Sequence, residues 1–277
     1  MIDFERNLLF LDEMSNIKLP NCNTEYKDPR YWDQRFENED CYEWLVDYNE
    51  IRSSLQKILQ SFDESSKFLQ LGCGNSNFAI DLYRDGYKDI TNIDISEVCV
   101  EKMSAKYPQL KFRTMDMTRL EFAENSFDVV LEKASLDSLL VDCKSPWDSS
   151  GPGYQSVTES LLEVKKVLKP AGIFVSITFA QPHFRVPLLA RPELGWSIEV
   201  EKFSGGRGLL DYFLLVCRAG DPGPALRRWA VSVSLSDTPG TFSREDNNNE
   251  EEPDLFLQRV QTSCFHSDSE SDGEGEE

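Results

Sequence analysis

The stretch F-L-Q-L-G-C-G-N-S at residues 68–76 most constrains what this chain can fold into. A short apolar run ends at Gly72 and Gly74, and a segment with apolar residues at helical spacing follows. Glycine tolerates positive φ and has no Cβ, so a strand that turns through G-x-G into a helix can bring backbone N–H groups close to a ligand. Turns of this kind also occur with nothing bound. The stretch therefore predicts a strand–turn–helix unit and leaves its ligand open.

The region from residue 68 to about residue 218 alternates apolar runs with helix-period segments, which is typical of parallel strands joined by crossover helices. The predicted strands are 68–71, 90–94, 111–115, 127–132 and 172–179. The predicted helices are 77–85, 96–107 and 154–168, the last with Pro170 and Gly172 as stop signals. Two β-like runs, 196–203 and 209–217, flank S-G-G-R-G and predict an antiparallel hairpin. We expect a single-domain α/β fold with a Rossmann-like, doubly wound, seven-stranded sheet that is mostly parallel.

The composition divides the chain into three parts. Residues 1–62 hold an aromatic-rich segment and an amphipathic segment, and we expect flank or lid helices there. Residues 63–218 form the predicted sheet domain. Residues 221–277 hold 14 acids against 4 basic residues, which is about half of the net charge of −20. Such a composition does not bury enough apolar surface to offset ordering entropy, so we expect a disordered acidic tail at 219–277.

Cysteine usage and charge limit the class of protein. The seven cysteines include no C-x-x-C pair, which predicts a reducing compartment and no metal site. No basic leader precedes the short apolar run near the N-terminus, and no apolar run approaches the roughly 18 residues of a membrane span. We therefore expect a membrane-free protein of the cytosol or nucleus, with the cytoplasm as the favoured location. The net charge of −20 repels phosphates and favours a basic protein partner over nucleic acid. We expect a monomer.

Two aspartates follow predicted strands at one edge of the sheet. Asp94 lies 22 residues after Gly72, where doubly wound folds place an acid that accepts hydrogen bonds from ribose hydroxyls. Asp116 follows the third strand, where a carboxylate can meet the exocyclic amine of adenine. A dinucleotide fingerprint needs a third glycine at position 77, which is asparagine here, and the chain has no P-loop. The pattern favours S-adenosylmethionine over a dinucleotide.

Several stretches together resemble the class I, seven-stranded methyltransferases. They are L-G-C-G-N-S at 71–76, N-I-D-I-S at 92–96, M-D-M at 115–117, S-F-D-V-V-L-E-K-A-S-L-D at 126–137 and E-V-K-K-V-L-K-P-A-G at 163–172. With Y-W-D-Q-R-F at 31–36, they look more specifically like the methyltransferase-like proteins that methylate lysines of translation elongation factor 1-alpha. The resemblance covers about residues 22–217 and not the acidic tail.

The resemblance implies an S-adenosylmethionine-dependent protein-lysine N-methyltransferase that acts on elongation factor 1-alpha. It also implies a set of cofactor-binding residues: Gly72 and Gly74 at the methionine part, Asp94 and Ile95 at the ribose, Asp116 and Met117 at the adenine, with Trp32, Phe36, Trp44 and Lys133 completing the pocket. Packing of the flank explains the two tryptophans as well. A small-molecule methyltransferase and a non-catalytic cofactor-binding interaction module remain as alternative functions.

Methyl transfer to lysine needs an unprotonated amine, and a free lysine has a pKa of about 10.4. A desolvating site lowers that pKa because it disfavours the ammonium. Glu132 and Asp137, in L-E-K-A-S-L-D, are candidate catalytic residues that attract and align the substrate lysine while water carries the proton away. The alternatives are a solvated strand end with a local Glu132–Lys133 ion pair and a helix cap at Asp137. Cys73 is expected to be a small buried filler rather than a nucleophile.

Overall fold

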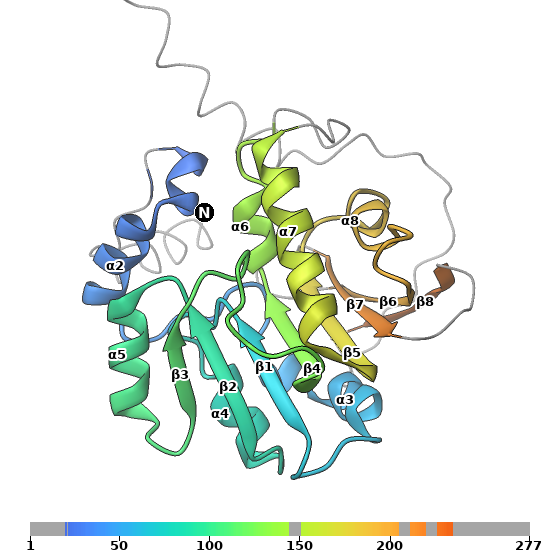
Figure 1. Cartoon of the computed structure of the whole chain (residues 1–277), viewed down its shortest axis with the longest axis horizontal. Coiled ribbons are helices and arrows are strands. Elements are labelled where there is room, and N and C mark those ends of the chain that lie inside the picture. The colour runs from blue at the N-terminus through green and yellow to red at the C-terminus, as the bar shows by residue number, and fades with distance from the viewer. Residues whose placement is uncertain (1–19, 21, 144–150, 205–210, 220–225, 235–277) are drawn as a thin grey trace, which may run out of the picture.

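A computed structural model describes residues 20, 22–143, 151–204, 211–219 and 226–234. Its strands form one sheet in the order β3-β2-β1-β4-β5-β7-β6-β8 (Figure 1). The strands are β1 Lys67–Leu71, β2 Asp89–Asp94, β3 Lys111–Thr114, β4 Phe127–Lys133, β5 Leu168–Thr178, β6 Trp196–Ser204, β7 Tyr212–Ala219 and β8 Leu226–Ser234. The helices are η1 Asn23–Lys27, α2 Pro29–Asn38, α3 Tyr48–Leu59, α4 Phe78–Arg84, α5 Glu97–Lys106, α6 Ser135–Leu139, α7 Pro152–Val167 and α8 Pro182–Leu189.

The pairing confirms the predicted mixed sheet. The first five strands pair in parallel, and β7 runs antiparallel to both β5 and β6. The predicted hairpin is therefore present, although its connection at 205–210 lies outside the described residues. Each βα unit obeys the expected rhythm because apolar runs fill the strands and helix-period segments cover them.

One predicted boundary is wrong. Pro170 and Gly172 do not separate the helix from a strand that begins at Gly172, because α7 ends at Val167 and β5 begins at once at Leu168. The register between β4 and β5 shifts after Leu168, from Phe127↔Leu168 to Val129↔Ile173. Such an irregularity is where a strand accommodates proline, which has no N–H for the ladder.

An eighth strand adds to the predicted seven. β8 pairs in parallel with the outer side of β6, at the edge of the sheet. The expectation that 219–277 is a disordered acidic tail is therefore wrong for Leu226–Ser234. This stretch, L-R-R-W-A-V-S-V-S, contains no acid, unlike the acidic segment after it. Residues 235–277 lie outside the described residues.

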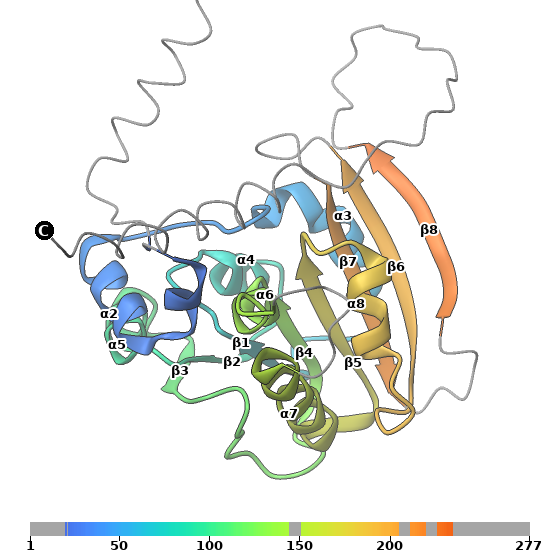
Figure 2. The same cartoon turned by 90° about the horizontal axis from the view of Figure 1, so that it is seen from above.

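The sheet is the middle layer of three. Figure 2 shows α3 and α4 on one face and α7 on the other. Buried residues of α3 and α4 form one apolar cluster with Phe68, Val129, Leu131 and Val175, while α7 and α8 form a second with Leu69, Leu71, Val130 and Phe174. Successive strand residues alternate between the clusters because side chains of a strand point to opposite faces.

The N-terminal flank makes a third, smaller cluster. Phe36 of α2 is buried with Cys99 and Met103 of α5, and Trp32 packs against them. Pro29 at the start of α2 and the Asp47–Glu50 capping box of α3 define where the flank helices begin. In Figure 1, α2 lies beyond the edge of the sheet where the parallel strands end. In the part of the chain that is described, no helix is long and apolar enough to cross a membrane.

Candidate active site

The glycine turn is held tightly between β2 and α6. Gly72 and Gly74 have φ of +54° and +53°, a region that favours glycine. A Cβ on Gly72 would lie 2.3 Å from the Oγ of Ser135, and this Oγ donates to the Leu71 and Gly72 carbonyls at 3.1 and 3.2 Å. The Cys73 N–H donates to the carbonyl of Ile93 at 3.0 Å. Glycine at position 72 is thus required both by backbone conformation and by the close approach of α6.

Asp94 closes the other side of the turn. Its Oδ2 accepts the Gly74 N–H at 2.8 Å, and its Oδ1 accepts the Ser96 N–H at 3.0 Å. Burial raises the pKa of this carboxyl group, and the backbone N–H donors oppose that effect. Each oxygen still has a second lone pair, since a carboxylate accepts about four hydrogen bonds. The next residue, Ile95, exposes 41% of its surface and offers an apolar face beside the buried acid.

Asp116 and Met117 lie at the same edge of the sheet, one strand further out. β3 pairs with β2 up to Asp94↔Thr114, and the Met115 N–H donates to the carbonyl of Asp94 at 2.9 Å. Asp116 is exposed, and its Oδ1 accepts from both the N–H and the hydroxyl of Thr118 at 2.8 Å. Met117 is half-buried and packs against the cluster under α7. The two aspartates predicted from strand ends are thus brought together.

The aromatic flank approaches the turn from above the sheet edge. The ring of Phe36 lies 3.7 Å from the position that a Cβ on Gly74 would take, and Trp32 stacks on Phe36 at 5.6 Å between ring centroids. The guanidinium of Arg35 lies 4.9 Å from the Trp44 ring and 5.9 Å from the Trp32 ring. A cation of the protein itself therefore already interacts with both tryptophans. Phe36 is the aromatic residue in direct reach of the turn.

Glu43 ties the flank to the sheet, and sequence reasoning missed it. Its carboxylate accepts from the Ser76 hydroxyl at 2.6 Å, the Asn77 N–H at 2.6 Å and the Lys133 ammonium at 2.7 Å. Lys133 also donates to the carbonyl of Val46 at 2.9 Å. Burial lowers the pKa of Lys133, and the nearby Glu43 carboxylate opposes this. The ammonium of Lys133 is thus engaged with the flank.

Further hydrogen bonds hold the flank in place around Glu43. Asn75, in the turn, accepts the Tyr42 N–H at 3.1 Å and donates to the carbonyl of Glu39 at 3.1 Å. The hydroxyl of Ser96 donates to Asp33 at 2.5 Å. No motif in C-Y-E-W, residues 41–44, identifies Glu43 as a functional residue, because its contacts are with residues far away in the chain.

Glu132 is buried rather than solvated. Only 1% of its surface is exposed, the Ser176 hydroxyl donates to one oxygen, and the Ser135 and Leu136 N–H groups donate to the other at 2.9 and 3.1 Å. The expected local ion pair with Lys133 is wrong, because adjacent residues of β4 point to opposite faces. The expected cap at Asp137 is also replaced, since Glu132 satisfies the first N–H groups of α6. Burial raises the pKa of Glu132 to about 7.

Asp137 forms a buried ion pair with Arg185 of α8. The guanidinium of Arg185 and the hydroxyl of Thr178 both donate to Oδ1, the latter at 2.7 Å. The Oδ2 atom of Asp137 and two nitrogens of Arg185 are buried without a hydrogen-bond partner among the described residues. The acid keeps one oxygen with unused acceptor capacity. Of the two acids predicted to be catalytic, only Asp137 has such an atom.

The comparisons with known proteins decide the family. Residues 69–176 match the family model described as a methyltransferase domain. The chain is 36% identical to EEF1A lysine methyltransferase 4 of Bos taurus over 88% of its length and 95% of that protein. It is 34% identical to the Mus musculus protein of the same name over 90% and 97%. The chain belongs to the EEF1A lysine methyltransferase family. It is an S-adenosylmethionine-dependent methyltransferase, as the motifs predicted.

Solved structures support the fold of the methyltransferase. The N-methyltransferase NodS from Bradyrhizobium japonicum, in complex with S-adenosyl-L-homocysteine, superposes with a TM-score of 0.53 at 18% identity over 72% of this chain and all of NodS. The [4+2]-cyclase SpnF superposes with a TM-score of 0.52 at 16% identity over 73% of this chain and 98% of SpnF. Because a cyclase shares the architecture, the fold alone does not name the reaction.

The site of the methyltransferase fits its cofactor. Gly74 has no Cβ, takes a positive φ and presents the turn beside a buried carboxylate with spare lone pairs. The predicted Cys73 is buried, as expected for a filler. The residues gathered at this edge are Gly72, Gly74, Asp94, Ile95, Asp116, Met117 and Phe36, whereas Trp32, Trp44 and Lys133 form the layer that holds the flank over them.

Proposed function

We propose that this methyltransferase transfers a methyl group from S-adenosylmethionine to the side-chain amine of a lysine in translation elongation factor 1-alpha. The observation that carries the proposal is the similarity over 88% of the chain and 95% of a bovine relative whose name states that reaction. The net charge of −20 supports a basic protein as substrate. The same charge disfavours nucleic acid as a partner. We further propose that the protein is a cytoplasmic monomer that does not bind membranes.

When bound, S-adenosylmethionine supplies a methyl group on a positively charged sulfur. The protein's own residues hold that molecule in place. The backbone at Gly72 and Gly74 would hold the methionine part, Asp94 would accept hydrogen bonds from the ribose hydroxyls beside the apolar face of Ile95, and Asp116 with Met117 would hold the adenine. Phe36 closes the pocket above the turn, within reach of Gly74.

The acceptor lysine approaches at the end of β4. The unpaired Oδ2 of Asp137 is buried, so it accepts from the target ammonium only once the arriving lysine displaces the atoms that cover it. Arg185 and Thr178 fix the orientation of the carboxyl group. Burial of the lysine under the flank lowers its pKa, so that the amine loses its proton to water. Aligning the amine with the methyl group then supplies the proximity advantage. Glu132 has an indirect role, because it caps the start of α6 and thereby positions Asp137.

Lys133 contributes by positioning the flank rather than by a direct contact. Its ammonium joins β4 to Glu43 and Val46, and Glu43 joins both to the turn. Trp32 and Trp44 pack around Arg35 in the same layer. We expect this layer to exclude water from the bound cofactor, which would strengthen the charged interactions beneath it.

Purified elongation factor 1-alpha, incubated with the enzyme and methyl-labelled S-adenosylmethionine, tests the proposal. We expect label on lysine, located by peptide mass spectrometry, and none with the D94A variant. If a cell lysate yields label only in extractable small molecules, the substrate is a metabolite. If the cofactor binds in calorimetry but no protein or metabolite is labelled, the chain is a cofactor-binding interaction module. Either result would contradict the proposal that the enzyme methylates a protein lysine.

A further inference from the structure

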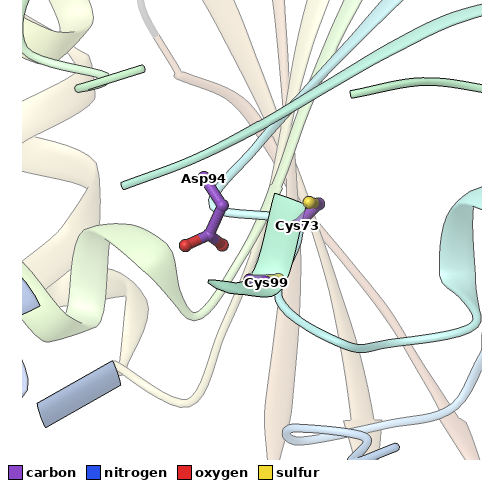
Figure 3. A group of neighbouring side chains, drawn as sticks. All are labelled: Cys73, Asp94 and Cys99. Atoms are coloured by element: carbon purple, nitrogen blue, oxygen red, sulfur yellow. The ribbon is translucent and has the colours of Figure 1, made fainter. Parts of the chain in front are cut away.

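Two thiols and a carboxylate lie close together beneath the glycine turn. Of the three, only the carboxylate has a role in the proposed methyl transfer. Cys73 comes from the turn, Asp94 from the end of β2 and Cys99 from α5 (Figure 3). Their sulfur and oxygen atoms all lie within 4.8 Å of one another, and all three residues are buried. The two cysteines are 26 residues apart, so they do not form a short cysteine motif in the sequence.

The backbone holds this group in place before any ligand arrives. The Cys73 N–H donates to the Ile93 carbonyl at 3.0 Å, and the Cys99 N–H donates to the Ser96 hydroxyl at 3.1 Å as part of the cap of α5. Asp94 is fixed by the Gly74 and Ser96 N–H groups. The backbone at both cysteines and the carboxylate of Asp94 are already fixed by the fold, so a ligand that bridges the three residues orders little more than the two thiol side chains.

The chemistry of the three atoms selects one class of ligand. Thiolates bind soft or borderline cations, and Zn²⁺ takes thiolate at about 2.3 Å and carboxylate oxygen at about 2.0–2.2 Å in a tetrahedral arrangement. Ligands of such an ion are separated by roughly 3.5–4 Å, so the group needs only a small contraction. Mg²⁺ and Ca²⁺ prefer oxygen donors and do not displace protons from thiols.

We propose that Cys73, Asp94 and Cys99 bind a soft divalent cation such as Zn²⁺, and that this ion and S-adenosylmethionine exclude each other. Two thiol protons leave as the two sulfur–metal bonds form. The exclusion follows because both ligands need the same elements: Asp94 is the ribose acceptor, and Cys73 lies between the two glycines that line the cofactor. Drawing Cys73 toward the ion moves the turn. This step depends on the assignment of the cofactor to Asp94.

Cobalt(II) provides a direct optical test, because thiolate ligands give an intense charge-transfer absorption. The reduced, full-length protein is titrated with Co²⁺ and then with Zn²⁺. We expect the band in the wild type, its displacement by Zn²⁺, and its loss in C99S. C217S is the control matched for burial, and C41S controls for an exposed thiol. Both should keep the band. A band that persists unchanged in a folded C99S would overturn the proposal.

A second measurement uses only the wild-type protein, and so does not depend on whether C99S folds. S-adenosyl-L-homocysteine should remove the cobalt band, and saturating Zn²⁺ should weaken binding of that nucleoside at least tenfold in calorimetry. For any one ion, its effect on nucleoside affinity and the effect of the nucleoside on its own affinity must match, because coupling between the same two ligands is reciprocal. C99S should keep nucleoside affinity and basal methylation while losing sensitivity to Zn²⁺. If Co²⁺ and the nucleoside bind together without affecting each other, the exclusion is refuted. Cobalt binding needs no methyl transfer, so its outcome is separate from that of the methylation assay.

Discussion

The carboxyl edge of the sheet has two halves that use acidic residues differently. On the β1–β2–β3 side, Asp94 accepts from the backbone N–H groups of Gly74 in the turn and of Ser96 before α5, and Asp116 is exposed. On the β4–β5 side, Glu132 bonds to Ser176 and to the start of α6, and Asp137 bonds to Arg185. The first half keeps acceptor capacity for a ligand, whereas most of that capacity in the second half is used inside the fold.

The difference teaches that burial of a carboxylate does not by itself identify a ligand-binding acid. Burial raises the pKa of both Asp94 and Glu132. Their partners distinguish the two acids: Asp94 accepts from the backbone N–H groups of Gly74 and Ser96, and Glu132 is enclosed by Ser176 and the start of α6. We infer that the first half binds the cofactor and the second half positions the acceptor.

Removing Asp94 should break the first half and give the largest effect. In D94A, affinity for S-adenosyl-L-homocysteine should fall at least about 100-fold, or about 3 kcal/mol, since two hydrogen bonds to a charged group are lost. Isothermal titration calorimetry measures it. The control is D89N at the other end of β2, where Asp89 forms a partly exposed ion pair with Lys111. Equal losses in both variants would show that the effect comes from folding.

Neutralising Glu132 tests the second half through stability. The folded protein holds the Glu132 proton up to a pKa of about 7, while the unfolded carboxyl group loses it near 4.5. Stability from this group is therefore present below about pH 4.5 and declines as the pH rises through about 7. In E132Q, denaturant unfolding should lack that decline, which is roughly 3 kcal/mol in the wild type. An identical pH profile in both proteins would mean that Glu132 ionises normally.

Disconnecting the flank should affect both halves moderately. E43Q weakens the contacts with Asn77 and Lys133, so the KM for S-adenosylmethionine should rise about tenfold, or about 1.4 kcal/mol, with a smaller change in kcat. Steady-state kinetics measures both constants. The variant K133M and the double variant complete a cycle that should show coupling. E97Q, at an exposed glutamate of α5, should leave both constants unchanged. Additive effects of E43Q and K133M would contradict a shared role.

Asp116 should give the smallest effect within the first half. It is exposed, and its Oδ1 is already engaged with Thr118, so D116N should weaken the nucleoside only about threefold, or about 0.6 kcal/mol. Competition of S-adenosylmethionine with its adenine-modified analogues measures the loss. A loss as large as that of D94A would mean that the adenine rather than the ribose dominates binding.

Much of the fold followed from local patterns. The five parallel strands, the helices between them and the hairpin agree with apolar periodicity, which each segment carries by itself. The edge strand β8 and the immediate start of β5 at Leu168 did not follow from it. An edge strand forms only where a neighbouring strand has a free side for pairing, and here that strand is β6. The local composition of the segment after β7 contains no information about that neighbour.

The sequence by itself determined the glycine turn, the place of Asp94 and Asp116 at strand ends, and the family of the methyltransferase. These are local properties, because backbone freedom and strand periodicity act over a few residues. Only the tertiary structure decided that Glu43 joins the flank to the turn, that Glu132 is fully hydrogen-bonded while Asp137 keeps a buried, unpaired oxygen, and that Cys73 and Cys99 meet. Each of these joins residues distant in the chain, and packing of the sheet and its helices sets the distances between them.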